Sequence, residues 1–166
     1  IIITTGRPNS TIGGQTTPST ILRLTFNQTS GSMVTDAVNI SSISNITITN
    51  GIFFTSTFSL TQDPSGGVII IEAGGTLKLG GTNTITAFTG YGFDVASTVD
   101  YAGTTQLIAN SPVYGNLIIS AACNKTAPSF LPLFMAGNFQ IRSGTFYANI
   151  NTHTYVLHWL LQVRAF

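Results

Sequence analysis

The sequence predicts an all-β chain that folds as a right-handed parallel β-helix, or β-solenoid, with coils of about 22 residues. Three observations lead to this prediction. Threonine (26), serine (15), asparagine (12) and glycine (17) make up 70 of the 166 residues, and these types favour strands and turns. Strong helix formers are scarce, with one glutamate and two lysines. Short apolar segments also recur between turn pairs such as Asn50-Gly51 and Gly74-Gly75.

The repeat appears when the chain is shifted against itself by about one coil. The apolar-polar alternation stays in phase over the overlaid segments, and a further shift of about two coils brings in two more. A β-solenoid requires such a period, because each coil must return to stack on its predecessor. The alternative fold is a β-sandwich. The overlaid segments are residues 71–73 with 93–95 and 76–79 with 98–101, followed by 139–141 and 145–147, while residues 121–132 break the pattern.

Each expected strand is a short run of apolar or threonine residues bounded by Gly, Asn or Ser. Residues 46–166 hold the regular repeats. Residues 1–45 have long, irregular spacers, so they are expected to be either an irregular β cap or coils with loop insertions. In chain order, the expected strands are residues 1–3, 21–26, 38–40, 46–49, 68–73, 76–79, 83–87, 92–95, 98–101, 116–120, 139–142, 145–148 and 154–158.

Alternation along each strand predicts which side chains point into the solenoid. Coil stacking at about 4.8 Å builds ladders of equivalent residues, which places Lys78 beside Asp100 as an exposed ion pair worth at most about 1 kcal/mol. The inward set is Ile71, Ala73, Leu77, Leu79, Phe93, Val95, Val99, Tyr101, Phe139, Ile141 and Phe146. The outward set is Glu72, Lys78, Asp94, Asp100, Gln140 and Tyr147.

Charge and length exclude several classes of protein. Only eleven residues are charged and the net charge is +1, which leaves no basic surface for nucleic acid. No apolar run approaches the roughly 20 residues that a transmembrane helix needs. The single cysteine, Cys123, cannot form an internal disulfide. The chain starts with Ile1 and without a basic-plus-apolar leader, so a processed or excised piece rather than a complete precursor is expected.

Three segments carry a family resemblance. Residues 97–106, residues 114–120 beginning Tyr-Gly-Asn-Leu, and residues 136–146 beginning Ala-Gly-Asn-Phe are followed by Thr154-Tyr155-Val156. In that order they resemble the repeats of large secreted surface proteins of the Bacteroidetes. Those proteins are adhesin-like β-solenoids, often exported by the type IX secretion system. The resemblance covers about residues 46–158 and implies an extracellular, surface-associated role without catalytic residues.

The best catalytic candidates are the outward carboxylates Glu72 and Asp94, which the repeat period places on adjacent coils. Paired carboxylates at about 5 to 9.5 Å support glycoside hydrolysis. No Arg, Lys or His is expected beside them on that face, so solvated carboxylates are the main expectation. His153 and His158 are spaced so that they would lie on opposite faces of a strand. We therefore expect no metal site and no cofactor, and Cys123 as a small buried residue.

Two kinds of side chain suggest a binding surface. The tyrosines Tyr91, Tyr114, Tyr147 and Tyr155 are expected at the surface, where they could stack on sugar rings. Stacked threonine ladders would suit ice binding. The Thr-x-Thr triplets do not share one register, however, and strand propensity explains them. These triplets start at Thr47, Thr55, Thr84 and Thr152.

These patterns favour a non-enzymatic structural or adhesive segment of a secreted bacterial cell-surface protein. Expected partners are copies of itself or the continuing parent chain through open solenoid ends, which present unpaired strand edges, and surface glycans. Pairing of these unpaired strand edges between copies would give a fibre of molecules stacked end to end. The alternatives are a polysaccharide-binding or polysaccharide-degrading β-helix and an ice-binding solenoid.

Overall fold

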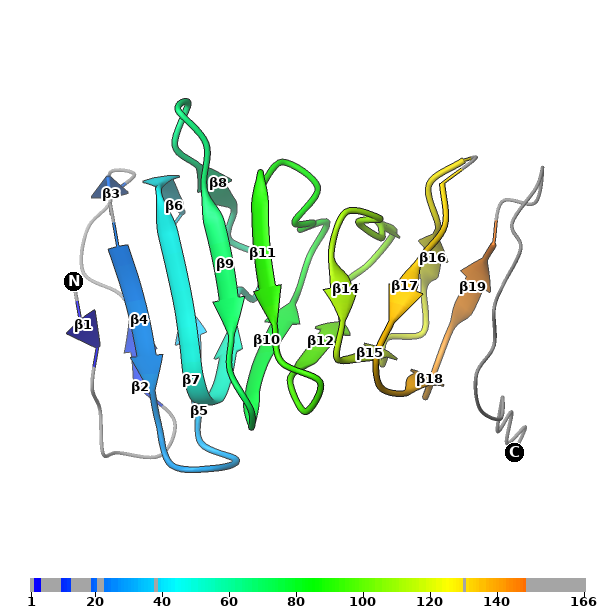
Figure 1. Cartoon of the computed structure of the whole chain (residues 1–166), viewed down its shortest axis with the longest axis horizontal. Helices are drawn as coiled ribbons and strands as arrows, with labels where there is room; N and C mark the ends of the chain where they lie inside the picture. The colour runs from blue at the N-terminus through cyan, green and yellow to red at the C-terminus, as the bar shows by residue number, and fades with distance from the viewer. Residues whose placement is uncertain are drawn as a thin grey trace.

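Three walls of parallel strands surround one apolar interior in the computed structural model, and successive coils follow one another along its long axis (Figure 1). The structure describes residues 2–3, 10–12, 19–20, 23–37, 39–129 and 131–148. These residues contain strands and no helix, and make about six turns with a spacing near 22 residues. The predicted β-solenoid is confirmed. The alternative β-sandwich is wrong, because its sheets would be antiparallel.

Each coil contributes one strand to each wall wherever the wall is continuous. The first wall consists of β1 (Ile2–Ile3), β4 (Arg23–Asn27), the first half of β7 (Asn45–Phe54), β9 (Val68–Ile71), β11 (Gly90–Phe93), β14 (Val113–Tyr114) and β17 (Phe134–Met135). The second wall consists of β2 (Ser10–Ile12), β5 (Met33–Asp36), the second half of β7, β10 (Gly75–Leu79), β12 (Thr98–Tyr101), β15 (Asn116–Ile119) and β18 (Phe139–Ile141). The third wall consists of β3 (Ser19–Thr20), β6 (Ile40–Ile43), β8 (Leu60–Gln62), β13 (Gln106–Leu107), β16 (Asn124–Thr126) and β19 (Thr145–Tyr147).

The step between equivalent residues varies from coil to coil. Thr76 pairs with Thr98, which is the step that the sequence shift predicts. Thr98 then pairs with Asn116, a shorter step, because the single residue Gly115 joins β14 to β15. If every coil had the same length, residues 139–141 would lie in the first wall, about two coils after residues 93–95. The shorter step instead places β18 in the second wall, where its Phe139 pairs with Leu117.

The described strands before residue 45 belong to the same solenoid. β1 pairs with β4, and β4 pairs with β7. β2 and β5 join the second wall in the same way, and β3 and β6 join the third. From their sequence, residues 1–45 are expected to be either an irregular β cap or coils with loop insertions. The described strands in this range pair as stacked coils do.

The interior is built from columns of equivalent apolar side chains. In the first wall Leu24, Ile46 and Ile69 stack and are fully buried. Rings from two walls meet where Phe26 stacks on Phe53 with centroids 4.1 Å apart. Each such buried side chain contributes about 1.5–3 kcal/mol of transfer free energy, so the stacking of coils is what holds the fold together.

Most of the inward and outward predictions agree with the observed burial, and four do not. Ala73 and Val95 are exposed, because β9 and β11 end before them and turns follow. Ile141 continues the column of Tyr101 and Ile119 but is 44% exposed on the last described strand of its wall. Asp100 lies at an outward position of its strand, as expected, and is nevertheless buried.

One strand prediction is wrong and one is untested. Residues 83–87 form turns, including a hydrogen bond from Phe88 N to Ile85 O of 3.1 Å, so the third wall is interrupted there. Residues 121–132, expected to break the pattern, contain β16. The strand expected at residues 154–158 lies outside the described residues. No helix in the described part of the chain has the length and apolar character needed to cross a membrane.

Candidate functional site

Glu72 and Asp94 stand on adjacent coils at one corner of the solenoid, as the sequence predicts. Ile71 pairs with Phe93, and each carboxylate residue follows directly. Both are exposed. Among the described residues neither carboxylate has an ion-pair partner. The structure therefore brings the two together without adding the cation or buried setting that an acid–base pair uses.

The same two residues shape the turns that connect the first wall to the second. Gly75 N donates to Glu72 O, and Ser97 N donates to Asp94 O, both at 2.9 Å. The Asp94 carboxylate also accepts a hydrogen bond of 2.8 Å from Ala96 N, which is the usual way that aspartate stabilises a turn. One oxygen of the Asp94 carboxylate is thus already used in a hydrogen bond within its own turn.

Only one of the four candidate tyrosines is a surface residue in the described structure. Tyr147 on β19 is 49% exposed. Tyr91 is half-buried, and its hydroxyl donates to the carbonyls of Ile85 and Phe88 at 2.6 and 2.7 Å. Tyr114 is fully buried, so its predicted exposure is wrong. Tyr155 lies outside the described residues.

Tyr114 and Tyr101 form a hydrogen-bonded pair inside the solenoid. Their hydroxyl oxygens are 3.2 Å apart, Tyr114 donates to Ala109 O at 2.7 Å, and Ala109 N donates to Tyr101 Oη at 3.1 Å. Burial raises the pKa of Tyr101 to about 12 and that of Tyr114 well above its usual value of 10. Burial likewise raises the pKa of Tyr91 to about 12. These tyrosines link the irregular part of the third wall to the other two walls.

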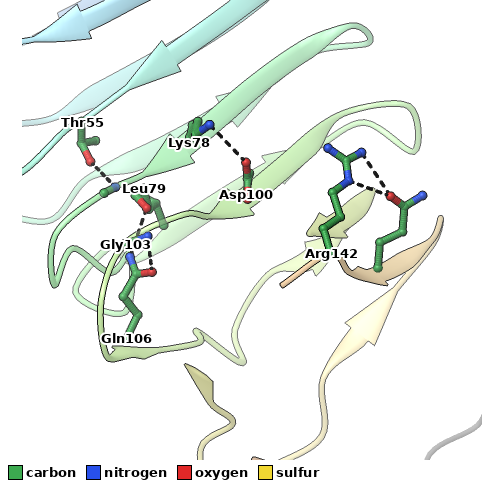
Figure 2. Close-up of polar contacts among 9 residues, drawn as sticks. Thr55, Lys78, Leu79, Asp100, Gly103, Gln106 and Arg142 are labelled. Carbon is green, nitrogen blue, oxygen red and sulfur yellow. Dashed lines mark hydrogen bonds and ion pairs between the residues drawn. The ribbon is translucent and has the colours of Figure 1, made fainter. Parts of the chain in front are cut away.

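Polar side chains line the corner between the second and third walls, and each contacts a neighbouring coil (Figure 2). The buried Thr55 hydroxyl accepts hydrogen bonds from Gly80 N (3.1 Å) and from Asn83 Nδ2 (2.9 Å). Gln106, also buried, accepts from Gly103 N at 3.0 Å and donates to Leu79 O at 3.2 Å. These contacts provide partners for Gly80 N and Gly103 N at the corner and add a second donor to Leu79 O, which also accepts from Ala102 N.

One coil further along, this corner holds a buried lysine. Lys125 pairs with Gln106 and is fully buried. Its ammonium donates to Gly103 O at 2.9 Å and to Thr104 O at 2.7 Å. Burial lowers the pKa of Lys125. Gln106 and Lys125 are not identified as corner residues from the sequence. The signal that could have found them is the shortened step from Gln106 to Lys125, which ends within residues 121–132, where the repeat is expected to break.

The outer side of the second wall carries the charged ladder (Figure 2). Lys78 Nζ lies 3.8 Å from Asp100 Oδ2 and 5.4 Å from the centroid of the Phe54 ring. The predicted ion pair is present, although Asp100 is buried rather than exposed. Further along the wall, Arg142 Nη2 donates to Gln140 Oε1 at 3.1 Å. A partly exposed ion pair such as Lys78–Asp100 contributes at most about 1 kcal/mol.

Asparagines connect successive coils at the corner between the first and second walls. Asn116 Nδ2 donates to Ser97 O at 2.9 Å, and Asn116 Oδ1 accepts from Asn138 N at 3.0 Å. The glycine before each asparagine is required by packing, since a Cβ at Gly115 would overlap Asp94 O. The Gly-Asn pairs singled out by the sequence therefore act as coil-to-coil connectors.

The remaining candidates show no assembled chemistry. The described residues contain no group of three or more His, Cys, Asp or Glu that could hold a metal ion. Cys123 is a free, half-buried thiol, and both histidines lie outside the described residues. Among the threonine triplets, Thr47 has Thr25 and Ile70 as ladder neighbours, while Thr55 is buried. The triplets therefore form no continuous threonine face in the part of the chain that is described.

The fold and the coil-to-coil strand pairing define the chain as a parallel β-solenoid. Most of the described polar side chains discussed above form hydrogen bonds within its own corners. Comparison with family models, with curated proteins and with solved structures finds no match. Any functional conclusion therefore rests on the residues themselves.

Proposed function

We propose that this chain is a non-enzymatic structural and adhesive segment of a secreted bacterial cell-surface protein. The observation that carries the proposal is the stacking of coils, in which equivalent residues repeat along three long walls. Such a stack makes a stiff rod whose stability comes from nearest-neighbour contacts between coils. Its function would be to display its outer faces along its length. The bacterial, extracellular setting is supported by the resemblance of the Gly-Asn repeats.

The low charge supports this role. With eleven charged side chains in 166 residues, the outer faces are mainly threonine, serine, asparagine and aliphatic side chains. Such faces cost less to desolvate than charged faces do when they contact an uncharged surface. At the last described coil Ile141 faces the interior column and is still 44% exposed. Stacking of a further coil would cover it.

Electron microscopy of the purified chain tests the display role. We expect rods of uniform width, with concentration-dependent end-to-end filaments where copies stack. Size-exclusion chromatography over a range of concentrations should follow the same association. Compact particles without an axial shape at every concentration would contradict the proposal.

The second candidate is a polysaccharide-active β-helix, favoured by the stacked carboxylates Glu72 and Asp94. We expect the unmutated chain to release no reducing sugar from polysaccharides. The double variant Glu72→Ala/Asp94→Ala should bind polysaccharide as the unmutated chain does, because both carboxylates are exposed and have no ion-pair partner among the described residues. Circular dichroism checks that the variant is folded. Turnover that disappears in the double variant would establish the enzyme and overturn our proposal.

A further inference from the structure

The outer side of the third wall carries two columns of uncharged side chains over β13, β16 and β19. We call the six residues the third-wall face. The register pairs Leu107 with Thr126 and Thr126 with Tyr147. Two residues earlier, Asn124 pairs with Thr145, and Thr105 precedes the paired Gln106. The face is therefore one largely apolar and aromatic column beside one polar column.

These side chains are available to a ligand. Tyr147 is 49% and Leu107 44% exposed, and the three residues of the polar column are all exposed. Within the described residues, the polar atoms of these side chains make no hydrogen bond to the protein. The strands that carry the third-wall face are held in place from the inside, because the inward-facing Gln106 and Lys125 are buried and hydrogen-bonded to the corner backbone.

The outer sides of the other two walls differ from this face. The second wall carries the Lys78–Asp100 ion pair. On the first wall the column of Thr25, Thr47 and Ile70 continues to Gly92, which has no side chain, and Val113 and Phe134 are exposed further along. A sugar ring presents an apolar face of C–H groups and a rim of hydroxyls. Recognition therefore needs an aromatic or aliphatic surface with hydrogen-bonding groups beside it.

We propose that the third-wall face binds a neutral, linear polysaccharide. The ligand would run along the solenoid axis, because the ladder spacing of about 4.8 Å between coils is close to the length of one sugar unit in an extended chain. Tyr147 stacks on one ring, Leu107 contacts a ring two coils away, and Asn124 with Thr145 binds hydroxyl groups. The absence of charge on the six side chains selects uncharged glycans. This inference rests on the proposed adhesive function and names its ligand class and its surface.

Binding to defined polysaccharides tests the inference. The neutral probes are microcrystalline cellulose, mixed-linkage β-glucan, xylan and mannan; the anionic probes are alginate and polygalacturonate. We expect binding to at least one neutral probe, with little dependence on salt because no ion pair forms. Tyr147→Ala should weaken it by about tenfold, the loss expected for one aromatic stacking contact. Tyr147→Phe keeps the ring and should retain most of the affinity.

Phe134→Ala is the matched control, since it removes an aromatic side chain of similar exposure from the first wall. The inference is overturned if no neutral probe binds, if Phe134→Ala weakens binding as much as Tyr147→Ala, or if only the anionic probes bind. None of these results would change the rods expected in electron microscopy. Release of reducing sugar by the unmutated chain would instead overturn the proposed non-enzymatic function, so the two failures are distinguishable.

Discussion

Replacement of Gly103 by alanine should lower the free energy of unfolding by about 3 kcal/mol or more, at the upper end of the cost of overpacking. A Cβ at this position would overlap Gly81 O and lie 2.7 Å from Gly80 C. Both are backbone atoms of the preceding coil, so no side chain can rotate away. Thr104 N also donates to Gly81 O at 2.7 Å, which fixes the two coils at this distance. The added methyl group must therefore push the coils apart.

Denaturant unfolding followed by circular dichroism measures this effect, and Gly92→Ala is its control. A Cβ at Gly92 would meet only Ile70 Cγ1, at 3.7 Å, an ordinary contact. Because alanine also reduces the entropy of the unfolded chain, we expect Gly92→Ala to change stability by less than about 1 kcal/mol. Equal losses in the two variants would show that close approach of coils is not the cause.

The second large effect is expected at high pH. The pKa of Tyr101 is raised to about 12 in the folded chain from a usual value of 10. The neutral phenol therefore stabilises the fold fully below pH 10, and this contribution is lost as the pH rises toward 12. For Tyr101 alone the loss is about 2–3 kcal/mol. Tyr114, whose pKa is raised in the same direction, adds to it.

Unfolding free energies measured at a series of pH values above 9, together with tyrosinate absorbance, test this expectation. Tyrosinate should form together with unfolding for the buried pair. Tyr101→Phe/Tyr114→Phe should flatten the pH dependence, whereas Tyr147→Phe, at an exposed position, should not. Unchanged stability up to pH 12 would contradict the role given to the buried hydroxyls.

The agreement between sequence and structure is best where the coils are regular. Residues 76–79 and 98–101 are related by the one-coil shift of the sequence and pair residue for residue. The stacked carboxylates Glu72 and Asp94 and the Lys78–Asp100 ion pair follow from that register alone. Alternation along a strand is a local property, so the sequence predicts it well.

The disagreements arise at corners and in shortened coils. Tyr114 is expected at the surface because the short strand β14 is not predicted from the sequence; it alternates with the exposed Val113, faces the interior and bonds to Ala109 O. Lys125 lies in a segment whose pattern looked broken, because a shorter step from Gln106 replaces the regular one. Both residues alternate with exposed neighbours in their strands, but alternation alone does not set which face of such a short strand is buried, since that depends on how many residues a neighbouring corner uses.

The sequence by itself determined the class of fold, the approximate coil length and the outward position of the charged ladder, because composition and alternation act over a few neighbouring residues. Only the tertiary structure decided that Tyr91 and Tyr114 close an irregular wall, that Lys125 is buried, and that Tyr147 remains on an uncharged face. The physical reason is that burial in a solenoid is set by the coils above and below. Those coils lie a full turn away in the sequence, at a step that changes with each corner.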